Sequence, residues 1–222
     1  KQSIESLTQT ASLFAEKKFE FVFHLASVSL IMDSEKNPQR AFEINVNATQ
    51  HLLDEIRKHE CKAVIASSSR VYAGSKQKFV ETDLIDGEKA YDKSKSKIDE
   101  MSREFAKQHS LGIGVTRNAN TFGGRDLNFS RIIPLIVSNV IQGKNPKFSN
   151  PQIERDFLFV KDAVTAYQSL AENLHKKEVQ GEAFNFGTGE TNSLEYVADR
   201  VIQINGDLDV QMEIEENERK NE

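Results

Sequence analysis

Short apolar runs of strand length alternate with longer amphipathic segments along most of the 222-residue chain. Three of these runs are Phe19–Phe23, Ala63–Ala66 and Ile113–Thr116. Two long segments with a helical spacing of apolar residues lie between them, at Pro38–His59 and Tyr91–His109. Because strands that alternate with helices form parallel βαβ units, the sequence predicts a twisted parallel sheet flanked by helices. We expect the three runs to be adjacent or near-adjacent strands of this sheet.

The same spacing rules predict further helices and strands. They are helices over residues 4–15, 132–141, 162–175 and 193–204, and strands over residues 157–160, 184–186 and 210–214. A loop rich in glycine and asparagine is expected from Asn118 to Asn128, and the charged tail from Glu213 to Glu222 is expected to fray. Together these elements predict an α/β fold whose last third returns segments to the main sheet.

The charge and the cysteine content of the chain limit its classes of function. The formal net charge is −5 and the lysines are spread among acidic residues, so we expect no nucleic-acid partner. No apolar run reaches the length of a membrane span, and the polar N-terminus does not resemble a signal peptide, so we expect no membrane partner. The single cysteine, Cys61, excludes an internal disulfide framework, and we expect a cytoplasmic protein in which Cys61 is core filler or a strand-edge thiol.

A tyrosine and a lysine, Tyr91 and Lys95, lie four residues apart at the start of the second amphipathic segment. On a helix, this spacing puts both side chains on one face, where the ammonium group favours the phenolate form of the tyrosine. Such a tyrosine can give and take protons near neutral pH, as a sugar or alcohol dehydrogenase requires. The alternative is a half-buried helix residue beside a solvated lysine. Tyr72 and Lys76 have the same spacing, but a predicted turn lies between them.

The ends of the predicted strands indicate where a ligand would bind. In open parallel sheets, ligands bind at the edge formed by the carboxyl ends of the strands. The residues at these ends are His24–Ser27, Ser67–Ser69 and Arg117–Asn120. They are therefore the candidate binding residues, and we assign no metal ligands.

Eight segments in chain order resemble one known family. They are His24–Ser27, Asn45–Thr49, Ser67–Tyr72, Tyr91–Lys95, Arg117–Gly123, Asp126–Pro134, Arg155–Asp162 and Phe184–Gly189. The series resembles the extended short-chain dehydrogenase/reductase family, the NAD-dependent epimerases and dehydratases of nucleotide sugars. Within the family, the CDP-glucose 4,6-dehydratase-like group is the most similar, through the sixth and seventh segments. Any one of these motifs is weak, but eight in the right order, across residues 19–204, are strong.

The resemblance implies a role for each matching position. Ser68 would hydrogen-bond the substrate hydroxyl, Tyr91 would be the catalytic base, and Lys95 would hold the nicotinamide ribose and favour the phenolate. The cofactor would be NAD, and the residues implied to bind it are His24, Leu25, Ala26, Ser27, Asn45, Ser67, Tyr91 and Lys95. The substrate would be a nucleotide sugar, and the residues implied to bind it are Ser69, Arg70, Asn120, Arg131 and Arg155.

The assignments of Arg155 and Ser68 each have a structural alternative. Arg131 and Arg155 would grip the diphosphate of the substrate, work that suits the planar guanidinium group. Arg155 and Asp156 could instead form a local ion pair at the surface. Ser68 could instead cap a helix or a turn.

The activity implied by the resemblance is NAD-dependent oxidation of the sugar C4 hydroxyl to a 4-keto intermediate, in an enzyme similar to the NDP-hexose 4,6-dehydratases. These dehydratases have Asp and then Lys or Glu directly after the catalytic Ser or Thr, where this chain has Ser69 and Arg70. Because neither side chain is a useful acid, the site favours 4-keto formation, epimerisation or reduction over loss of water. The glycine-rich dinucleotide loop of the family is also expected and is not found. The alternative is a non-catalytic nucleotide-sugar-binding relative, or a fragment without the cofactor loop.

The resemblance also implies a division of the chain and an assembly. Residues 1–125 would form a Rossmann-like NAD-binding domain whose N-terminal strands are missing, and residues 126–222 would form mainly a small substrate-binding lobe. The helices Pro38–His59 and Tyr91–His109 follow neighbouring strands and should lie on one face of the sheet. In the family, this pair of helices makes a four-helix interface, so we expect a homodimer.

Overall fold

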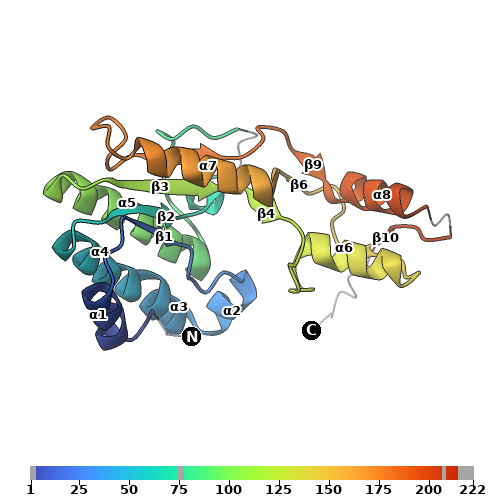
Figure 1. The fold of residues 1–222 in the computed structure, drawn as a ribbon. Coiled ribbons are helices and arrows are strands. Elements are labelled where there is room, and N and C mark those ends of the chain that lie inside the picture. The colour runs from blue at the N-terminus through green and yellow to red at the C-terminus, as the bar shows by residue number, and fades with distance from the viewer. Residues whose placement is uncertain (1–3, 75–77, 207–208, 215–222) are drawn as a thin grey trace. The chain divides into compact units, whose positions relative to one another are not determined.

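A computed structural model describes residues 4–74, 78–206 and 209–214 of the chain. The chain folds into two compact units. Unit 1 comprises residues 1–119 and 162–186, and unit 2 comprises residues 120–161 and 187–222. Figure 1 shows the elements of both units along the chain. The functions expected for residues 1–125 and 126–222 stay predictions.

Unit 1 is built on a four-stranded sheet. Its strands are β1 (Phe21–His24), β2 (Lys62–Ala66), β3 (Ile113–Asn118) and β8 (Ala183–Phe186). They lie in the order β1-β2-β3-β8 and every pair is parallel. The predicted parallel sheet and the adjacency of its first three strands are therefore confirmed. Strands β2 and β3 are almost wholly buried, as expected for central parallel strands covered on both faces.

Helices cover both faces of this sheet (Figure 1). One face is covered by α1 (Leu7–Glu16), α4 (Ala48–Lys58) and α5 (Ala90–His109). The other face is covered by the part of α7 (Val160–Asn173) that belongs to unit 1, which begins at Asp162. The first face packs a core that includes Leu53, Ile56, Ile98 and Cys61. The second face packs Tyr167, Leu170 and Leu174 against the sheet. Cys61 is buried in this core and its thiol donates to the Phe19 carbonyl oxygen at 3.1 Å, so of its two expected roles it has that of core filler.

The predicted helix over Pro38–His59 differs from the structure in detail. It is divided into α3 (Pro38–Phe42), a π-helical segment (Glu43–Asn47) and α4. A short helix that the sequence analysis missed, α2 (Ile31–Lys36), precedes it. The amide oxygen of Asn37 accepts from the Arg40 N–H at 3.0 Å and caps the start of α3. The π-helical segment turns the Asn45 side chain into the interior, where it is fully buried.

Unit 2 has a small core between α6 (Ile132–Ile141) and α8 (Leu194–Asn205). Its described residues also form three two-stranded ladders, of which the first two named below are parallel and the third is antiparallel. They are β4 (Asn120–Phe122) with β7 (Phe157–Phe159), β5 (Lys147–Phe148) with β10 (Glu213–Ile214), and β6 (Glu154–Arg155) with β9 (Asn192–Ser193).

Several predicted boundaries in this region were wrong. The loop expected from Asn118 to Asn128 contains strand β4, because residues 120–122 pair with β7, a partner that only the tertiary fold supplies. Val160 begins α7 and does not end a strand. Of the strand expected over residues 210–214, only Glu213 and Ile214 pair, so the tail does not fray at its first two residues. Residues 215–222 of that tail lie outside the described residues.

Candidate active site at the carboxyl edge of the sheet

The carboxyl ends of β1 and β2 and the first turns of α5 bring most of the predicted unit 1 residues together. Lys95 is buried, and its Nζ atom donates to the carbonyl oxygen of Ala66 at 2.8 Å, at the end of β2. The same Nζ atom lies 5.9 Å from the centroid of the Tyr91 ring. Tyr91 is buried too, so the predicted shared helix face is confirmed and the alternative of a solvated lysine is wrong.

The burial of Lys95 has an electrostatic consequence. Removing an ammonium group from water disfavours its charged form, and this burial lowers the pKa of Lys95 from 10.5 to about 8. An ammonium group has three N–H donors, and Ala66 O is one acceptor. The lysine is therefore held charged at neutral pH in a site where a bound ligand can use its remaining donors.

The start of α5 is set by two contacts that the sequence analysis missed. The Ala90 N–H donates to the Glu35 carboxylate at 2.7 Å, which caps the helix from α2. Gly87 lies so close to Asp92 that a Cβ atom at that position would be 2.6 Å from the Asp92 backbone. A larger residue would push the first turn of α5 away, so glycine is required for the position of Tyr91.

A turn of serines follows β2 and lies against α5. The Ser67 hydroxyl donates to the Lys95 carbonyl oxygen at 3.3 Å. The Ser68 hydroxyl oxygen accepts from the Arg70 N–H at 3.2 Å and caps the short 3₁₀ turn over residues 69–71. The structural alternative for Ser68 is therefore confirmed. In this cap the Ser68 oxygen only accepts a hydrogen bond. Among the described contacts, the Ser68 O–H donates to no other group and can donate to a ligand.

Arg70 is held by an acidic residue of α5. Its Nε and Nη2 atoms donate to the two carboxylate oxygens of Asp92, at 2.7 and 3.0 Å. Asp92 is buried, and about a third of the Arg70 side chain is exposed. These two bonds use the Nε hydrogen and one Nη2 hydrogen of Arg70 within the protein. The predicted direct contact of Arg70 with a substrate would therefore use the remaining hydrogens of Nη1 and Nη2. Ser69, beside it, is half-buried.

The segment after β1 is held by Asn45. Its amide oxygen accepts from the Val28 N–H at 2.7 Å, and its amide nitrogen donates to the Val28 carbonyl oxygen at 3.2 Å and to the Ser94 hydroxyl at 2.9 Å. Both amide hydrogens and the amide oxygen are therefore used inside the fold. These bonds show that Asn45 holds the segment Leu25–Val28 against α5, and its expected contact with the cofactor stays a prediction. Leu25 and Ala26 of this segment are exposed, and Ser27 is half-buried.

His24 ends β1 and is buried beneath this segment. Its Nε2 atom lies 2.8 Å from the Thr49 hydroxyl, which itself donates to the Asn45 carbonyl oxygen at 2.6 Å. Because the threonine proton is used, His24 Nε2 carries a hydrogen and donates. Burial, with a smaller effect of the nearby Lys95 charge, lowers the pKa of His24 to about 4. His24 is therefore neutral at physiological pH, and through Thr49 it is hydrogen-bonded to the segment that contains Asn45.

The remaining predicted residues belong to unit 2. Asn120 opens β4 and is exposed, and Arg131 precedes α6 with its Nη1 atom 3.1 Å from the Asp126 carboxylate. Arg155 is exposed on β6 and donates to the carbonyl oxygen of Glu154. Its neighbour Asp156 accepts three hydrogen bonds from Thr188 and Gly189 at 2.8 to 3.1 Å. The carboxylate of Asp156 thus organises that turn.

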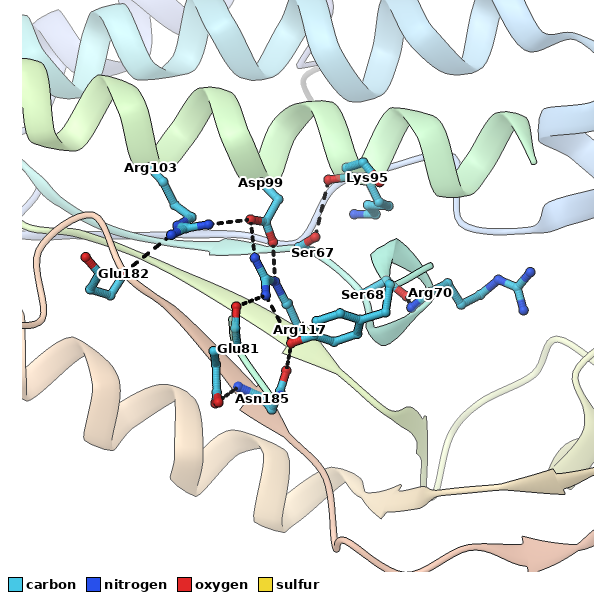
Figure 2. A network of polar contacts seen from close by, with 12 residues as sticks. Ser67, Ser68, Arg70, Glu81, Lys95, Asp99, Arg103, Arg117, Glu182 and Asn185 are labelled. Carbon is cyan, nitrogen blue, oxygen red and sulfur yellow. Dashed lines mark hydrogen bonds and ion pairs between the residues drawn. The ribbon is translucent and has the colours of Figure 1, made fainter. Parts of the chain in front are cut away.

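The sequence analysis missed a buried ionic network beneath the serine turn, drawn in Figure 2. Arg117 of β3 is fully buried and pairs with Asp99 of α5 through two hydrogen bonds of 2.8 and 2.9 Å. Arg103 extends the network from Asp99 to Glu182. Two signals pointed to it: an arginine directly after a buried strand, and an aspartate one helical turn after Lys95.

Two kinds of feature are absent from the part of the chain that the structure describes. No described helix combines the length and hydrophobicity of a membrane span. Within the same residues, no group of three His, Cys, Asp or Glu side chains is arranged to hold a metal ion.

Curated proteins similar to this chain are enzymes of nucleotide sugars by name. CDP-glucose 4,6-dehydratase of Salmonella typhimurium (strain LT2) is 26% identical over 220 residues, which cover 92% of this chain and 61% of that protein. UDP-glucose 4-epimerase of Pisum sativum is 27% identical over 209 residues, which cover 84% of this chain and 59% of that protein. The chain therefore spans about three fifths of the length of these relatives.

Solved structures share the fold. The structure of UDP-glucose 4-epimerase with UDP-glucose from Thermotoga maritima has a TM-score of 0.85 at 23% identity, over 96% of this chain and 69% of that one. The dTDP-glucose 4,6-dehydratase of Bacillus anthracis in complex with NAD has a TM-score of 0.82 at 24% identity, over 97% of this chain and 67% of that one. The sequence model described as the NAD dependent epimerase/dehydratase family matches residues 3–187. The predicted resemblance is confirmed, and the chain belongs to this family.

Proposed function

We propose that the protein uses NAD to oxidise the C4 hydroxyl of a nucleotide-linked hexose to a 4-keto sugar. The observation that carries this proposal is the buried Tyr91–Lys95 pair on one face of α5, next to the serine turn after β2. A tyrosine base and a lysine beside a hydroxyl donor are the groups that removal of an alcohol proton requires. The family and the names of the relatives supply the class of substrate and cofactor.

The residues of unit 1 fit the nicotinamide half of NAD. Lys95 Nζ has hydrogen-bond donors beyond the one used on Ala66, and they suit the hydroxyl groups of a ribose. Leu25 and Ala26 are exposed at the end of β1 and offer small or apolar surface to a flat ring. When bound, NAD supplies the acceptor for the hydride that leaves C4.

The residues of the chain would then act in sequence on one hydroxyl group. The free O–H of Ser68 donates to the sugar oxygen and orients it, and the phenolate of Tyr91 takes the proton of the C4 hydroxyl. The charge of Lys95 stabilises that phenolate. Asn120, Arg131 and Arg155 of unit 2 are proposed to bind the substrate, with the two guanidinium groups on its diphosphate.

Epimerisation and dehydration both begin from the 4-keto sugar and diverge at the next step. A 4,6-dehydratase must also expel the C6 hydroxyl as water, which needs a positioned proton donor. Arg70 is held by Asp92, and neither a guanidinium group nor a serine hydroxyl such as that of Ser69 is a useful acid. The side chains after Ser68 therefore favour a 4-keto product or an epimer, although the matching motifs are dehydratase-like.

The direct test is mass spectrometry of the product after incubation of the protein with NAD and CDP-, dTDP- or UDP-hexoses. We expect a 4-keto or epimerised sugar, and the Tyr91→Phe variant as the matched control should form neither. A product lighter by the mass of one water would identify the protein as a dehydratase and show that another residue supplies the acid. If the protein binds one of these nucleotide sugars but converts none of them, the alternative of a non-catalytic nucleotide-sugar-binding protein is favoured and the proposal is overturned.

A further inference from the structure

Arg117 is the centre of a polar cluster that joins four segments of unit 1. Besides its two bonds to Asp99 of α5, its Nη1 atom donates to the Tyr72 hydroxyl at 3.0 Å and to the Glu81 carbonyl oxygen at 2.8 Å. Arg117 and Asp99 are both fully buried. The pair neutralises itself, so the two further bonds of Arg117 are available to hold the segment after the serine turn. Figure 2 shows Arg117 between Asp99, Glu81 and Asn185.

Asn185 of β8 holds the same segment from a second strand. Its backbone N–H donates to the Glu81 carboxylate at 2.8 Å, and its side-chain nitrogen donates to the Phe79 carbonyl oxygen at 3.0 Å. The Tyr72 hydroxyl donates to the Asn185 amide oxygen at 2.5 Å, since its own oxygen accepts from Arg117. The Tyr72 ring also stacks on the Phe79 ring, with centroids 4.6 Å apart. Residues 79–81 are thus fastened to β3 and β8.

The fastened segment folds back onto the chain that follows Ser68. The Ala73 N–H donates to the Leu84 carbonyl oxygen and the Asp86 N–H to that of Val71, each at 3.0 Å. The Val71 side chain is fully buried, and its N–H donates to the Ser68 carbonyl oxygen at 3.2 Å. The serine turn is therefore held on one side by α5, through Arg70 and Asp92, and on the other by this returning segment.

We propose that Tyr72, Arg117 and Asn185 are positioning residues for Ser68. They fasten residues 79–81 to the sheet, and through this segment they fix the turn that presents the Ser68 hydroxyl next to the first turns of α5. The inference rests on the proposed function for its catalytic consequence, because misplacing a hydroxyl group by a fraction of an ångström lowers the rate of a reaction that needs aligned groups. Its structural part, the coupling of the segment to the turn, is independent of any activity.

The test compares two buried tyrosines that each lose only a hydroxyl group. Tyr72→Phe keeps the stacked ring and removes the bonds to Arg117 and Asn185. Tyr167→Phe is the matched control, because its hydroxyl bonds Thr116 and Asn118 on the other face of the sheet. Glu81→Ala is a milder second variant at an exposed position, which removes only the acceptor of the Asn185 N–H. Amide hydrogen exchange of each variant is followed by mass spectrometry or NMR, and the kinetics are measured with NAD and the accepted sugar nucleotide.

In Tyr72→Phe, we expect the amides of residues 79–86 and of residues 70–72 to exchange about tenfold faster, with a smaller increase in Glu81→Ala and none in Tyr167→Phe. The kcat should fall about tenfold in Tyr72→Phe, while the affinity for NAD changes less than about twofold. Unchanged exchange at residues 70–72 would overturn the coupling, whether or not the protein turns over a sugar. Faster exchange with an unchanged kcat would overturn the role in positioning. Absence of any turnover would count against the proposed function alone, with the exchange result still deciding the coupling.

Discussion

At the scale of single residues, Tyr91 gives the most direct test, because phenylalanine keeps the buried ring and removes only the hydroxyl group. We expect Tyr91→Phe to lower kcat at least about 100-fold, since proton transfer is lost in the transition state. Binding of the nucleotide sugar should change little, which isothermal calorimetry can check. An active Tyr91→Phe enzyme would mean that another group takes the proton.

We expect the buried charge of Lys95 to lower the free energy of unfolding while it supports the reaction. Its pKa is 10.5 in the unfolded chain and about 8 in the fold, so the unfolded state binds its proton more tightly. The charged lysine therefore costs the fold about 3 kcal/mol at any pH below 8, and the cost fades as the pH rises to 10.5. Lys95→Met removes this cost but also leaves the Ala66 carbonyl oxygen without its donor, at about 1 kcal/mol. We expect a net gain of roughly 1–2 kcal/mol at pH 7.

Urea denaturation of Lys95→Met checks this sign, and activity checks the function. The gain in the free energy of unfolding should shrink between pH 8 and pH 10.5, where the wild-type lysine becomes neutral in the fold. The turnover should fall at the same time, and the pH at which activity rises should move upward because the phenolate loses its cationic neighbour. A variant that is less stable than wild type at pH 7 would contradict the stated cost of the buried charge.

His24 should make the fold sensitive to acid. Its pKa is lowered from 6.5 to about 4 by burial, so as the pH falls from 6.5 the unfolded chain takes up a proton before the folded chain does. The free energy of unfolding should therefore drop by about 3 kcal/mol between pH 6.5 and pH 4 on account of this group. In His24→Gln that part of the drop should disappear, whereas His175→Gln, at an exposed position, should retain it. Equal pH profiles for all three proteins would contradict the assignment.

At the scale of elements, the position of α5 depends on the close approach of Gly87. A Cβ atom there would lie 2.6 Å from the Asp92 backbone, so Gly87→Ala must displace the first turn of α5, which carries Tyr91. We expect a loss of about 1–3 kcal/mol in the free energy of unfolding, together with reduced turnover. The control is Gly124→Ala, where a Cβ atom meets nothing within 4 Å. Equal losses in the two variants, measured by urea denaturation, would show that the close approach is not required.

At the scale of the whole molecule, the homodimer through α4 and α5 stays a prediction, and the described surface of α5 makes it sharper. The exposed residues of α5 include charges of both signs, at Lys93, Lys97, Glu100, Glu104 and Lys107. A dimer formed over this surface would depend on paired charges that salt screens. We expect light scattering to report a dimer at tens of micromolar in low salt and a shift toward monomer near 1 M salt. A monomer at every salt concentration would contradict the prediction.

The sequence alone determined the parallel sheet and the heart of the candidate site. Each depends on residues close together in the chain: apolar runs of strand length between helical patterns, and a tyrosine and a lysine one helical turn apart. The chain direction then brings the residues after β1 and β2 to one edge, because parallel strands share their carboxyl ends. Local periodicity and connectivity were therefore sufficient to predict that the first three strands are parallel neighbours and that Tyr91 and Lys95 share a helix face.

Only the tertiary structure decided which polar side chains remain free to meet a ligand. Asn45 and Arg70 carry the right chemistry for a site, yet both are bonded to partners inside the fold. Tyr72 and Asn185 lie 113 residues apart in sequence and meet only because β8 pairs with β3. Such contacts leave no periodic signal, since each depends on one long-range packing arrangement. Burial also sets the charge states of His24 and Lys95, because removal from water lowers the pKa values of both side chains. No local sequence pattern indicates this burial.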